Sequence, residues 1–401
     1  MSFTKPAQAV GGSSPTLSPT RTIGLAGAGL SLIAVCYGLA RFAYGLFVPE
    51  FRESFTLTAG QTGLIAAAGY ASYCVGVVAA TTGTPRFGAR AVAVAAGSLA
   101  TAGTALIAVA PTAVVLAAGV TIAGVGTGVA SPPLGHAIAL RVVPRHRDRI
   151  QTIVNAGTGL GVAISGPVAM LAEDRWRAAW LAFAAVAAAV TVWVRIHVPS
   201  AVGAPGPAGT DEPTTRHAAF PSGALRMLGA AAVVGAATAA VWTFGQELLV
   251  TVGGHDRTLA TTAWIVLGVS GLLGAVSGEL VRRVGLQRAW TISTAAVCAA
   301  TALLAAASRQ PAVAVAASAL FGAVYIAVTG VLLVWSTRVY PTQPATGVGL
   351  AFLLVAVGQA AAAPVLGFVA DRAGLTTSFW MSAGVALAAV AVTPPARFRR
   401  T

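Results

Sequence analysis

The chain has 401 residues, of which 56% are hydrophobic and only 9% are charged, and its mean hydropathy is +0.80. Soluble globular domains carry about 25% charged residues. This composition excludes an ordinary cytosolic enzyme, a disordered chain and a secreted disulfide scaffold. It also excludes an outer-membrane barrel, because the apolar runs are long and do not alternate with polar residues.

The formal net charge of +14 comes from 25 Lys and Arg residues against 11 Asp and Glu residues. The basic residues lie between apolar runs rather than in one module, so the excess charge indicates membrane topology, and no nucleic-acid partner is expected. Three cysteines, Cys36, Cys74 and Cys298, are scattered through apolar runs without CxxC spacing. We therefore expect no disulfide framework, metal site or cofactor.

Twelve apolar runs are long enough to cross a membrane, since a helix needs about 20 apolar residues to span a ~30 Å hydrocarbon core. The sequence thus predicts an all-α integral membrane protein. Residues 1–21, rich in Ser, Thr, Pro and Gly, predict a flexible cytoplasmic tail rather than a signal peptide. The predicted spans are 22–48, 60–80, 91–110, 112–139, 151–172, 178–198, 227–250, 259–280, 289–308, 311–336, 346–369 and 376–394.

A polar segment at 199–225 divides these spans into two halves of six. We expect an N-terminal bundle at 22–198, a cytoplasmic linker at 199–225, a C-terminal bundle at 226–394 and a cytoplasmic tail at 395–401. Eighteen of the 25 basic residues fall on one side of the membrane and six on the other. Basic loops stay in the cytoplasm, so both termini are predicted to be cytoplasmic, in the inner membrane of a bacterium.

The two halves repeat at a constant offset of 197 residues. Arg86-Phe87-Gly88 matches Arg283-Val284-Gly285, and Asp174-Arg175 matches Asp371-Arg372. Six helices separate equivalent positions, so the halves have the same orientation in the bilayer. A parallel repeat of this kind is a transporter architecture, in which two bundles rock about a site held between them.

These motifs resemble the major facilitator superfamily, whose members carry a Gly- and Arg-containing loop after the second helix. The resemblance covers the chain from Thr22 onward and implies gating loops, although Pro85 and Arg282 stand where the family has an acid. The helix-one stretch from Arg41 to Gly45 resembles an uncharacterised bacterial branch with Arg-Phe-x-Tyr-Gly. The implied gating residues are Arg86, Gly88, Arg90, Arg282, Arg283, Gly285, Asp371 and Arg372.

Helix five contains a series of glycines that ends in Gly166-Pro167. This series resembles the antiporter motif of the superfamily, without its terminal Gly-Gly. The resemblance slightly favours efflux over uptake.

Arg41 lies inside the first span, where a charge costs at least about 2.5–3.5 kcal/mol and usually faces a cavity. Tyr37, Arg41 and Tyr44 fall on one helical face at i, i+4 and i+7. This spacing predicts that the face lines a central cavity, where Arg41 binds an anionic or carbonyl-bearing group or closes the outer gate. The alternative is a structural Arg paired with backbone carbonyls.

Glu247 is the acid inside the outer half of a span, so it is a candidate proton-coupling carboxylate, or else an interfacial acid in water. Thr238, Trp242 and Gln246 form a second stripe in the same helix. His136 is either a proton relay or a packing residue. Three further candidates bind substrate or simply link and pack helices: Asn155, Tyr325 and Gln359.

The sequence therefore predicts a monomeric secondary transporter that moves a small organic molecule by alternating access, coupled to protons and slightly favouring efflux. Two alternatives stay open at this stage. One is an uptake permease for a small organic anion, and the other is a membrane sensor or enzyme on the same scaffold without net transport. The substrate itself is not readable from the chain.

Overall fold

A computed structural model describes residues 16–172, 175–200 and 221–395. The predicted tail at 1–21 and the linker at 199–225 fall largely outside these residues, as do Asp174 and most of the C-terminal tail. In chain order the helices are α1 (Pro19–Ile33), η1 (Ala34–Phe42), α2 (Ala43–Leu46), α3 (Val48–Phe55), α4 (Ala59–Phe87), α5 (Ala89–Ala108), α6 (Ala113–Arg141), α7 (Pro144–Ala172), α8 (Trp176–His197), α9 (Ala224–Glu247), η2 (Leu248–Val252), α10 (Arg257–Gly271), η3 (Leu272–Val276), α11 (Ser277–Val284), α12 (Leu286–Ala307), α13 (Pro311–Val339), α14 (Pro344–Ala373) and α15 (Leu375–Ala391).

The predicted all-α membrane fold is confirmed. Within the described residues, eleven helical segments are long and apolar enough to span a membrane. The twelfth, α15, has 17 residues, which cover about 25 Å at 1.5 Å per residue. The twelfth predicted span is therefore an apolar helix that is shorter than the other eleven.

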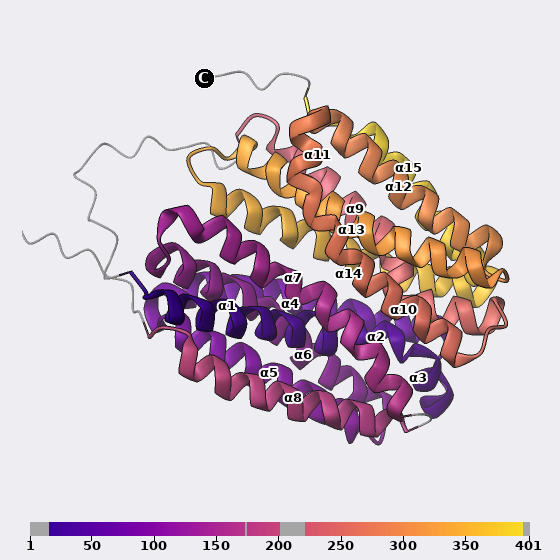
Figure 1. The fold of residues 1–401 in the computed structure, drawn as a ribbon. Coiled ribbons are helices and arrows are strands. Elements are labelled where there is room, and N and C mark those ends of the chain that lie inside the picture. The colour runs from indigo at the N-terminus through magenta and orange to yellow at the C-terminus, as the bar shows by residue number, and fades with distance from the viewer. Residues whose placement is uncertain (1–15, 173–174, 201–220, 396–401) are drawn as a thin grey trace, which may run out of the picture.

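The helices form two bundles that lie side by side (Figure 1). In the first bundle α4, α5 and α6 pack on one another and α8 packs on α5. In the second bundle α12 packs on α13 and α15. The bundles meet where α4 lies against α14, α7 against α10, and α2 against α9. We call the end of the molecule where α3 lies the α3 end, and the opposite end the α11 end (Figure 1).

Three interhelical loops contain the same glycine turn, and two of these glycines, Gly88 and Gly285, are related by the sequence repeat. Gly88, Gly285 and Gly374 have φ values of 82°, 82° and 85°, a region that favours glycine. Each glycine amide donates to the carbonyl four residues earlier and starts the next helix. Loops of both halves thus turn by the same mechanism.

Three spans depart from the predicted regular helices. The first contains a π-helical segment, η1, and the seventh ends in another, η2. The eighth changes from α10 through the 3₁₀ turn η3 into α11. Several glycines of the eighth span meet backbone closely: a Cβ on Gly268 would lie 2.5 Å from the amide nitrogen of Ala163, and one on Gly274 2.6 Å from the carbonyl of Ala323. Hydropathy sums do not register such local changes of helix type.

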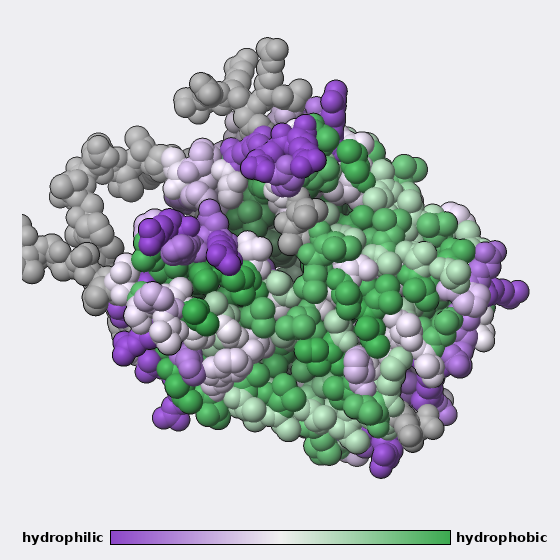
Figure 2. Space-filling view, in the orientation of Figure 1, coloured by the Kyte–Doolittle hydropathy of each residue, from purple (hydrophilic) through white to green (hydrophobic). Residues whose placement is uncertain are grey.

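On the face that Figure 2 shows, a broad apolar belt lies between hydrophilic ends. Large apolar side chains stand exposed on it, among them Val114, Leu171 and Leu225. Exposure of this kind is expected where lipid rather than water is the solvent. A recess between two hydrophilic groups is visible at the α11 end (Figure 2).

Candidate functional site: a caged arginine and a polar gate

The π-helical segment η1 places Arg41 at the meeting of the two bundles. Gly161 of α7 packs against the backbone of η1 at Ala34 and Gly38, so close that no Cβ fits. Segments of π-helix are rare and frequently occur at functional sites, because the wider turn redirects side chains. Here the wider turn directs Arg41 toward the other bundle.

The Arg41 guanidinium lies among four aromatic rings of the first bundle. Its central carbon is 4.4 Å from the ring centroid of Tyr73 and 5.1 Å from those of Phe42 and Tyr70. The Tyr37 ring is 5.9 Å away. Cation–π contacts of this length stabilise a desolvated guanidinium, although they do not neutralise its charge.

One hydrogen bond joins Arg41 to the opposite bundle. Its Nη2 donates to Oε1 of Gln359 on α14 at 2.8 Å. The Nε of Arg41 and the Nε2 of Gln359 are buried without a hydrogen-bond partner. In the described part of the chain no acidic side chain pairs with Arg41.

The tyrosine hydroxyls around Arg41 bond to one another and to neighbouring helices. The Tyr37 hydroxyl lies 3.2 Å from that of Tyr73 and 3.0 Å from that of Ser131. The Tyr70 hydroxyl lies 3.3 Å from that of Thr243 on α9, across the bundle interface. These bonds fix the cage and use its hydroxyl groups.

An aromatic cluster adjoins the cage from the second bundle. Phe42 stacks on Trp242 at a centroid distance of 4.0 Å, and Trp242 also lies edge-on to Tyr325 at 5.0 Å. Tyr325 lies beside Gln359. Trp242 is 3% exposed, and its indole Nε1 has no hydrogen-bond partner.

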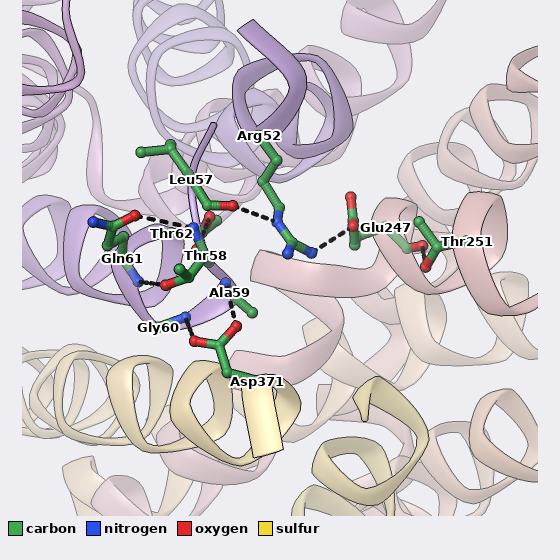
Figure 3. Close-up of polar contacts among 10 residues, drawn as sticks. All are labelled: Arg52, Leu57, Thr58, Ala59, Gly60, Gln61, Thr62, Glu247, Thr251 and Asp371. Carbon is green, nitrogen blue, oxygen red and sulfur yellow. Dashed lines mark hydrogen bonds and ion pairs between the residues drawn. The ribbon is translucent and has the colours of Figure 1, made fainter. Parts of the chain in front are cut away.

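A second polar site closes the α3 end (Figure 3). Arg52 on α3 donates to a Glu247 carboxylate oxygen of α9 at 2.6 Å and to the Leu57 carbonyl at 3.1 Å. The Asp371 carboxylate at the end of α14 accepts from the amides of Ala59 and Gly60, at 2.7 and 2.8 Å. A carboxylate at the first turn of α4 accepts hydrogen bonds from amides that have no partner within the helix. The helix dipole also favours a negative charge at this position.

The same gate also includes ionic contacts between α10 and α3. Arg257 of α10 lies 3.4 Å from Glu50 and 3.3 Å from Glu53, both on α3. Burial raises the pKa of Glu50, and the nearby charge of Glu247 raises it further, while Arg257 opposes this change. An open depression of about 730 Å³ lies among these residues: Pro49, Arg52, Glu53, Thr56, Leu57, Thr58, Glu247, Val250, Thr251, Arg257 and Asp371.

The structure brings some of the predicted residues together and separates others. Arg41, Tyr37, Gln359, Trp242 and Tyr325 gather around one centre. Tyr44 does not join them, because the π-helical turn rotates it away from Arg41.

The Tyr44 hydroxyl instead donates to the Thr62 carbonyl at 2.9 Å, inside the first bundle. Gln246 is also turned away from the centre, with its Nε2 3.5 Å from the Thr261 hydroxyl. Asn155 is exposed on α7 and accepts a hydrogen bond from Gln151. His136 is half-buried near the α11 end of α6, with Nε2 lacking a partner.

The predicted gating loops have local contacts at the α11 end. Arg90 donates to the Val198 carbonyl at 2.7 Å, and Arg86 is exposed. Arg282 and Arg283 pair with Glu279 of their own helix. Asp371 joins the two bundles at the α3 end, and the Arg372 side chain folds over the Phe368 ring.

Sequence reasoning missed four members of the gate: Glu50, Arg52, Glu53 and Arg257. Arg52 and Arg257 lie in loops predicted to face outward, where charges are normally solvated. Their partners are 195 and more than 200 residues away. The one signal available was the density of charge between the first two spans.

Comparisons with known proteins place this architecture in a family. Residues 33–393 match the family described as uncharacterised MFS-type transporter YbfB. A curated relative, the transcription regulatory protein OpdE of Pseudomonas aeruginosa, is 27% identical over 267 residues, 64% of this chain. The match spans 65% of that relative, less than two thirds of its length.

Solved transporter structures share the fold at low sequence identity. A mutant of the nucleoside transporter NupG has a TM-score of 0.72 at 13% identity, covering 91% of this chain and 98% of its own. The inward-open xylose transporter XylE from E. coli has a TM-score of 0.72 at 14% identity, covering 92% and 95%. A bacterial homologue of the lysosomal transporter Spinster, inward-facing and occupied, has a TM-score of 0.71 at 16% identity, covering 94% and 96%.

At these identities the solved structures establish the major facilitator fold alone, while the family match covers nearly the whole chain. The chain is a multi-pass membrane protein that belongs to the family of uncharacterised MFS-type transporters described as YbfB.

Proposed function

We propose that this transporter moves a small organic molecule by alternating access, with Arg41 at the central binding site. The observation that carries the proposal is the position of Arg41 between the bundles. The guanidinium is bonded to Gln359 across the interface, and its Nε lacks a partner. Because an unpaired charge inside the bilayer costs several kcal/mol, it is expected to serve a ligand.

We further propose that the α11 end faces the cytoplasm and that this conformation is open inward. The excess of Arg near that end supports the orientation. The gate of Arg52, Glu247 and Asp371 holds the α3 end together. Asn155, in the half of α7 that is nearer the α11 end, is exposed.

Proton coupling is proposed to act through Glu247, whose carboxylate is bound by Arg52. A proton arriving from the α3 end neutralises Glu247 and removes the attraction to Arg52, which weakens the gate. The second carboxylate oxygen of Glu247 is buried without a partner, so it is the place for that proton. His136, near the α11 end of its span, is proposed as the relay on the opposite side.

Efflux is proposed over uptake on the strength of the glycine series in α7. This segment packs on η1 through Gly161 and on α10 through Gly159, so it touches both moving bundles. The uptake alternative predicts the same site but the opposite dependence on gradient direction. The description of the curated relative as a regulatory protein supports the non-transporting sensor as a second candidate.

Flux measured in proteoliposomes with an imposed proton gradient tests the proposal. The panel is benzoate, xylose, adenosine and ethidium, which represent four substrate classes. We expect flux of one class to be lost in Arg41→Ala and kept in Arg195→Ala, which removes an exposed Arg at the end of α8. Wild-type flux in Arg41→Ala would contradict the proposed site, and absence of flux for all four would favour the sensor.

A further inference from the structure

We infer that the central site takes an organic monocarboxylate whose body is flat and apolar, such as an aromatic acid. This inference rests on the proposed transport function and specifies its substrate class. It is carried by the hydrogen-bonding groups that remain unused around Arg41. It is also carried by the rings that enclose them.

The unused polar atoms at the centre are all donors. Arg41 Nε, Gln359 Nε2 and Trp242 Nε1 are each buried and lack a partner. The orientation of the Gln359 amide is set by Arg41, which donates to its oxygen, so the amide nitrogen faces Tyr325 instead of Arg41. An unsatisfied buried donor costs about 1–3 kcal/mol, so this set calls for a ligand that supplies acceptors.

Most acceptors near the centre already take part in a hydrogen bond. The Gln359 oxygen receives Arg41, and the Tyr37, Tyr73 and Ser131 hydroxyls bond among themselves. The Tyr70 hydroxyl is engaged by Thr243. A sugar or nucleoside needs partners for its own hydroxyl donors as well as its acceptors. The site therefore disfavours polyols.

The positive charge of the site favours a ligand with a single negative charge. Arg41 is the one ionised side chain in the cage of Tyr37, Phe42, Tyr70 and Tyr73, so an organic cation meets repulsion there. A dianion such as a phosphate monoester would leave one charge unpaired in a poorly hydrated place. A carboxylate brings one charge and two acceptor oxygens, and it matches the planar guanidinium fork.

The rings define the remainder of the ligand. Phe42 and Trp242 stack at 4.0 Å, while Tyr325 and Phe321 stack at 6.0 Å. The Trp242 donor lies within this cluster, next to the cage. Aromatic surfaces of this kind prefer a flat apolar partner, which gains both burial and ring contact.

Equilibrium binding to the purified full-length protein tests the inference. The probe is benzoate, compared with benzamide as a neutral isostere, acetate as an acid without a ring, benzylamine as a cation, phenyl phosphate and xylose. We expect benzoate to bind at least about tenfold more tightly than any of these. Arg41→Ala should weaken benzoate binding about 10- to 100-fold, in line with loss of a charge-assisted pair.

Three further variants test the roles of individual side chains. Arg41→Lys retains the charge without the fork and should bind benzoate with intermediate affinity. Gln359→Leu removes one unused donor and should weaken benzoate binding about 3- to 10-fold. Because this variant keeps Arg41, it still tests the site if Arg41→Ala fails to fold. Tyr44→Phe changes a buried tyrosine outside the cage and should leave benzoate affinity unchanged.

The outcomes separate this inference from the proposed function. Benzoate binding that requires Arg41 without benzoate flux in proteoliposomes would uphold the site and overturn transport. Flux of another class with no preferential carboxylate binding would uphold transport and overturn this inference. Equal binding of benzamide or xylose, no binding of benzoate, or unchanged affinity in Arg41→Ala would each overturn it as well.

Discussion

Arg52 and Glu247 form the most direct ionic link between the bundles, with a nitrogen–oxygen distance of 2.6 Å. The Glu247 side chain is 6% exposed, whereas that of Arg52 is 27% exposed. Removing the arginine would leave a buried carboxylate unpaired, while removing the carboxylate would leave an arginine that can reach water. The two single substitutions are thus not equivalent.

We expect Arg52→Ala to destabilise the protein by about 1–3 kcal/mol and Glu247→Gln to destabilise it less. The double variant should recover part of the loss in Arg52→Ala, because the unpaired charge is gone. Thermal unfolding of all four forms in one detergent measures this cycle. Additive effects would show that the pair does not couple.

Glu247→Gln tests proton coupling as well. The amide cannot release a proton, so transport of the substrate identified by flux should become insensitive to an imposed pH gradient. Flux along a substrate gradient alone should persist. A gradient response equal to that of the wild type would move the coupling site elsewhere.

Glu50 predicts a pH dependence of stability at the α3 end. Burial raises its pKa above the ordinary value of 4.5, helped by Glu247 and Glu53 and opposed by Arg257. A carboxyl with a raised folded-state pKa holds its proton more tightly when folded. Its contribution to stability is complete below the unfolded pKa and is lost as pH rises through the folded pKa.

The Tm of the wild type should therefore fall relative to that of Glu50→Gln as pH rises from about 4.5 upward. Thermal scans of both proteins at matched ionic strength measure the difference. A difference that is constant with pH, or that grows in favour of the wild type, would contradict the assignment.

At the scale of elements, the contact of α4 with α14 decides how tightly the α3 end closes. Gly63 faces the carbonyl of Ala363, and Gly367 faces the carbonyl of Ala59, each so closely that a Cβ does not fit. These reciprocal contacts bring the two backbones together, as small residues do in membrane helices. The Asp371 carboxylate can reach the first turn of α4 only because of this approach.

Gly63→Ala should separate the two helices and favour the conformation open at the α3 end. Gly384→Ala in α15 is the matched control, because a Cβ there meets no atom within 4 Å. The control should gain up to about 1 kcal/mol from helix propensity alone, and Gly63→Ala should not. Cys74, half-buried beside the Leu353 carbonyl, should react faster with an external maleimide in Gly63→Ala.

At the scale of the whole molecule, the polar side-chain links between the bundles that the described residues show gather at the α3 end and around Arg41. The deepest of them toward the α11 end is the contact of Cys74 with the Leu353 carbonyl, at 3.8 Å. From this contact toward the α11 end, α4 continues to its last residue, Phe87, and α14 extends to its first residue, Pro344. The asymmetry supports a vestibule open at the α11 end.

Asn155→Cys reports on this vestibule in a background with Cys74 and Cys298 replaced by Ser. An impermeant maleimide should label it from the cytoplasmic side only, because Asn155 is exposed toward the α11 end. Thr251→Cys at the α3 end is the control and should react from the other side only. Labelling of Asn155→Cys from the external side alone would reverse the proposed orientation.

The sequence by itself determined the features that depend on local sums: the apolar runs, the two halves, their parallel repeat and the major facilitator fold. Arg41 was identifiable as a candidate functional residue because a charge within an apolar run is costly wherever its partners lie. Tyr44 was placed wrongly beside it, since the i, i+4, i+7 spacing assumes a regular α-helix and η1 is a π-helix.

Only the tertiary structure decided the partners. Gln359 lies 318 residues from Arg41, and Glu247 lies 195 residues from Arg52. Nothing in a hydropathy profile or a charge count relates positions that far apart. The reason is physical: burial and topology follow from the transfer of each segment into lipid, whereas a hydrogen bond requires two atoms within about 3 Å. That distance is set by how the bundles pack.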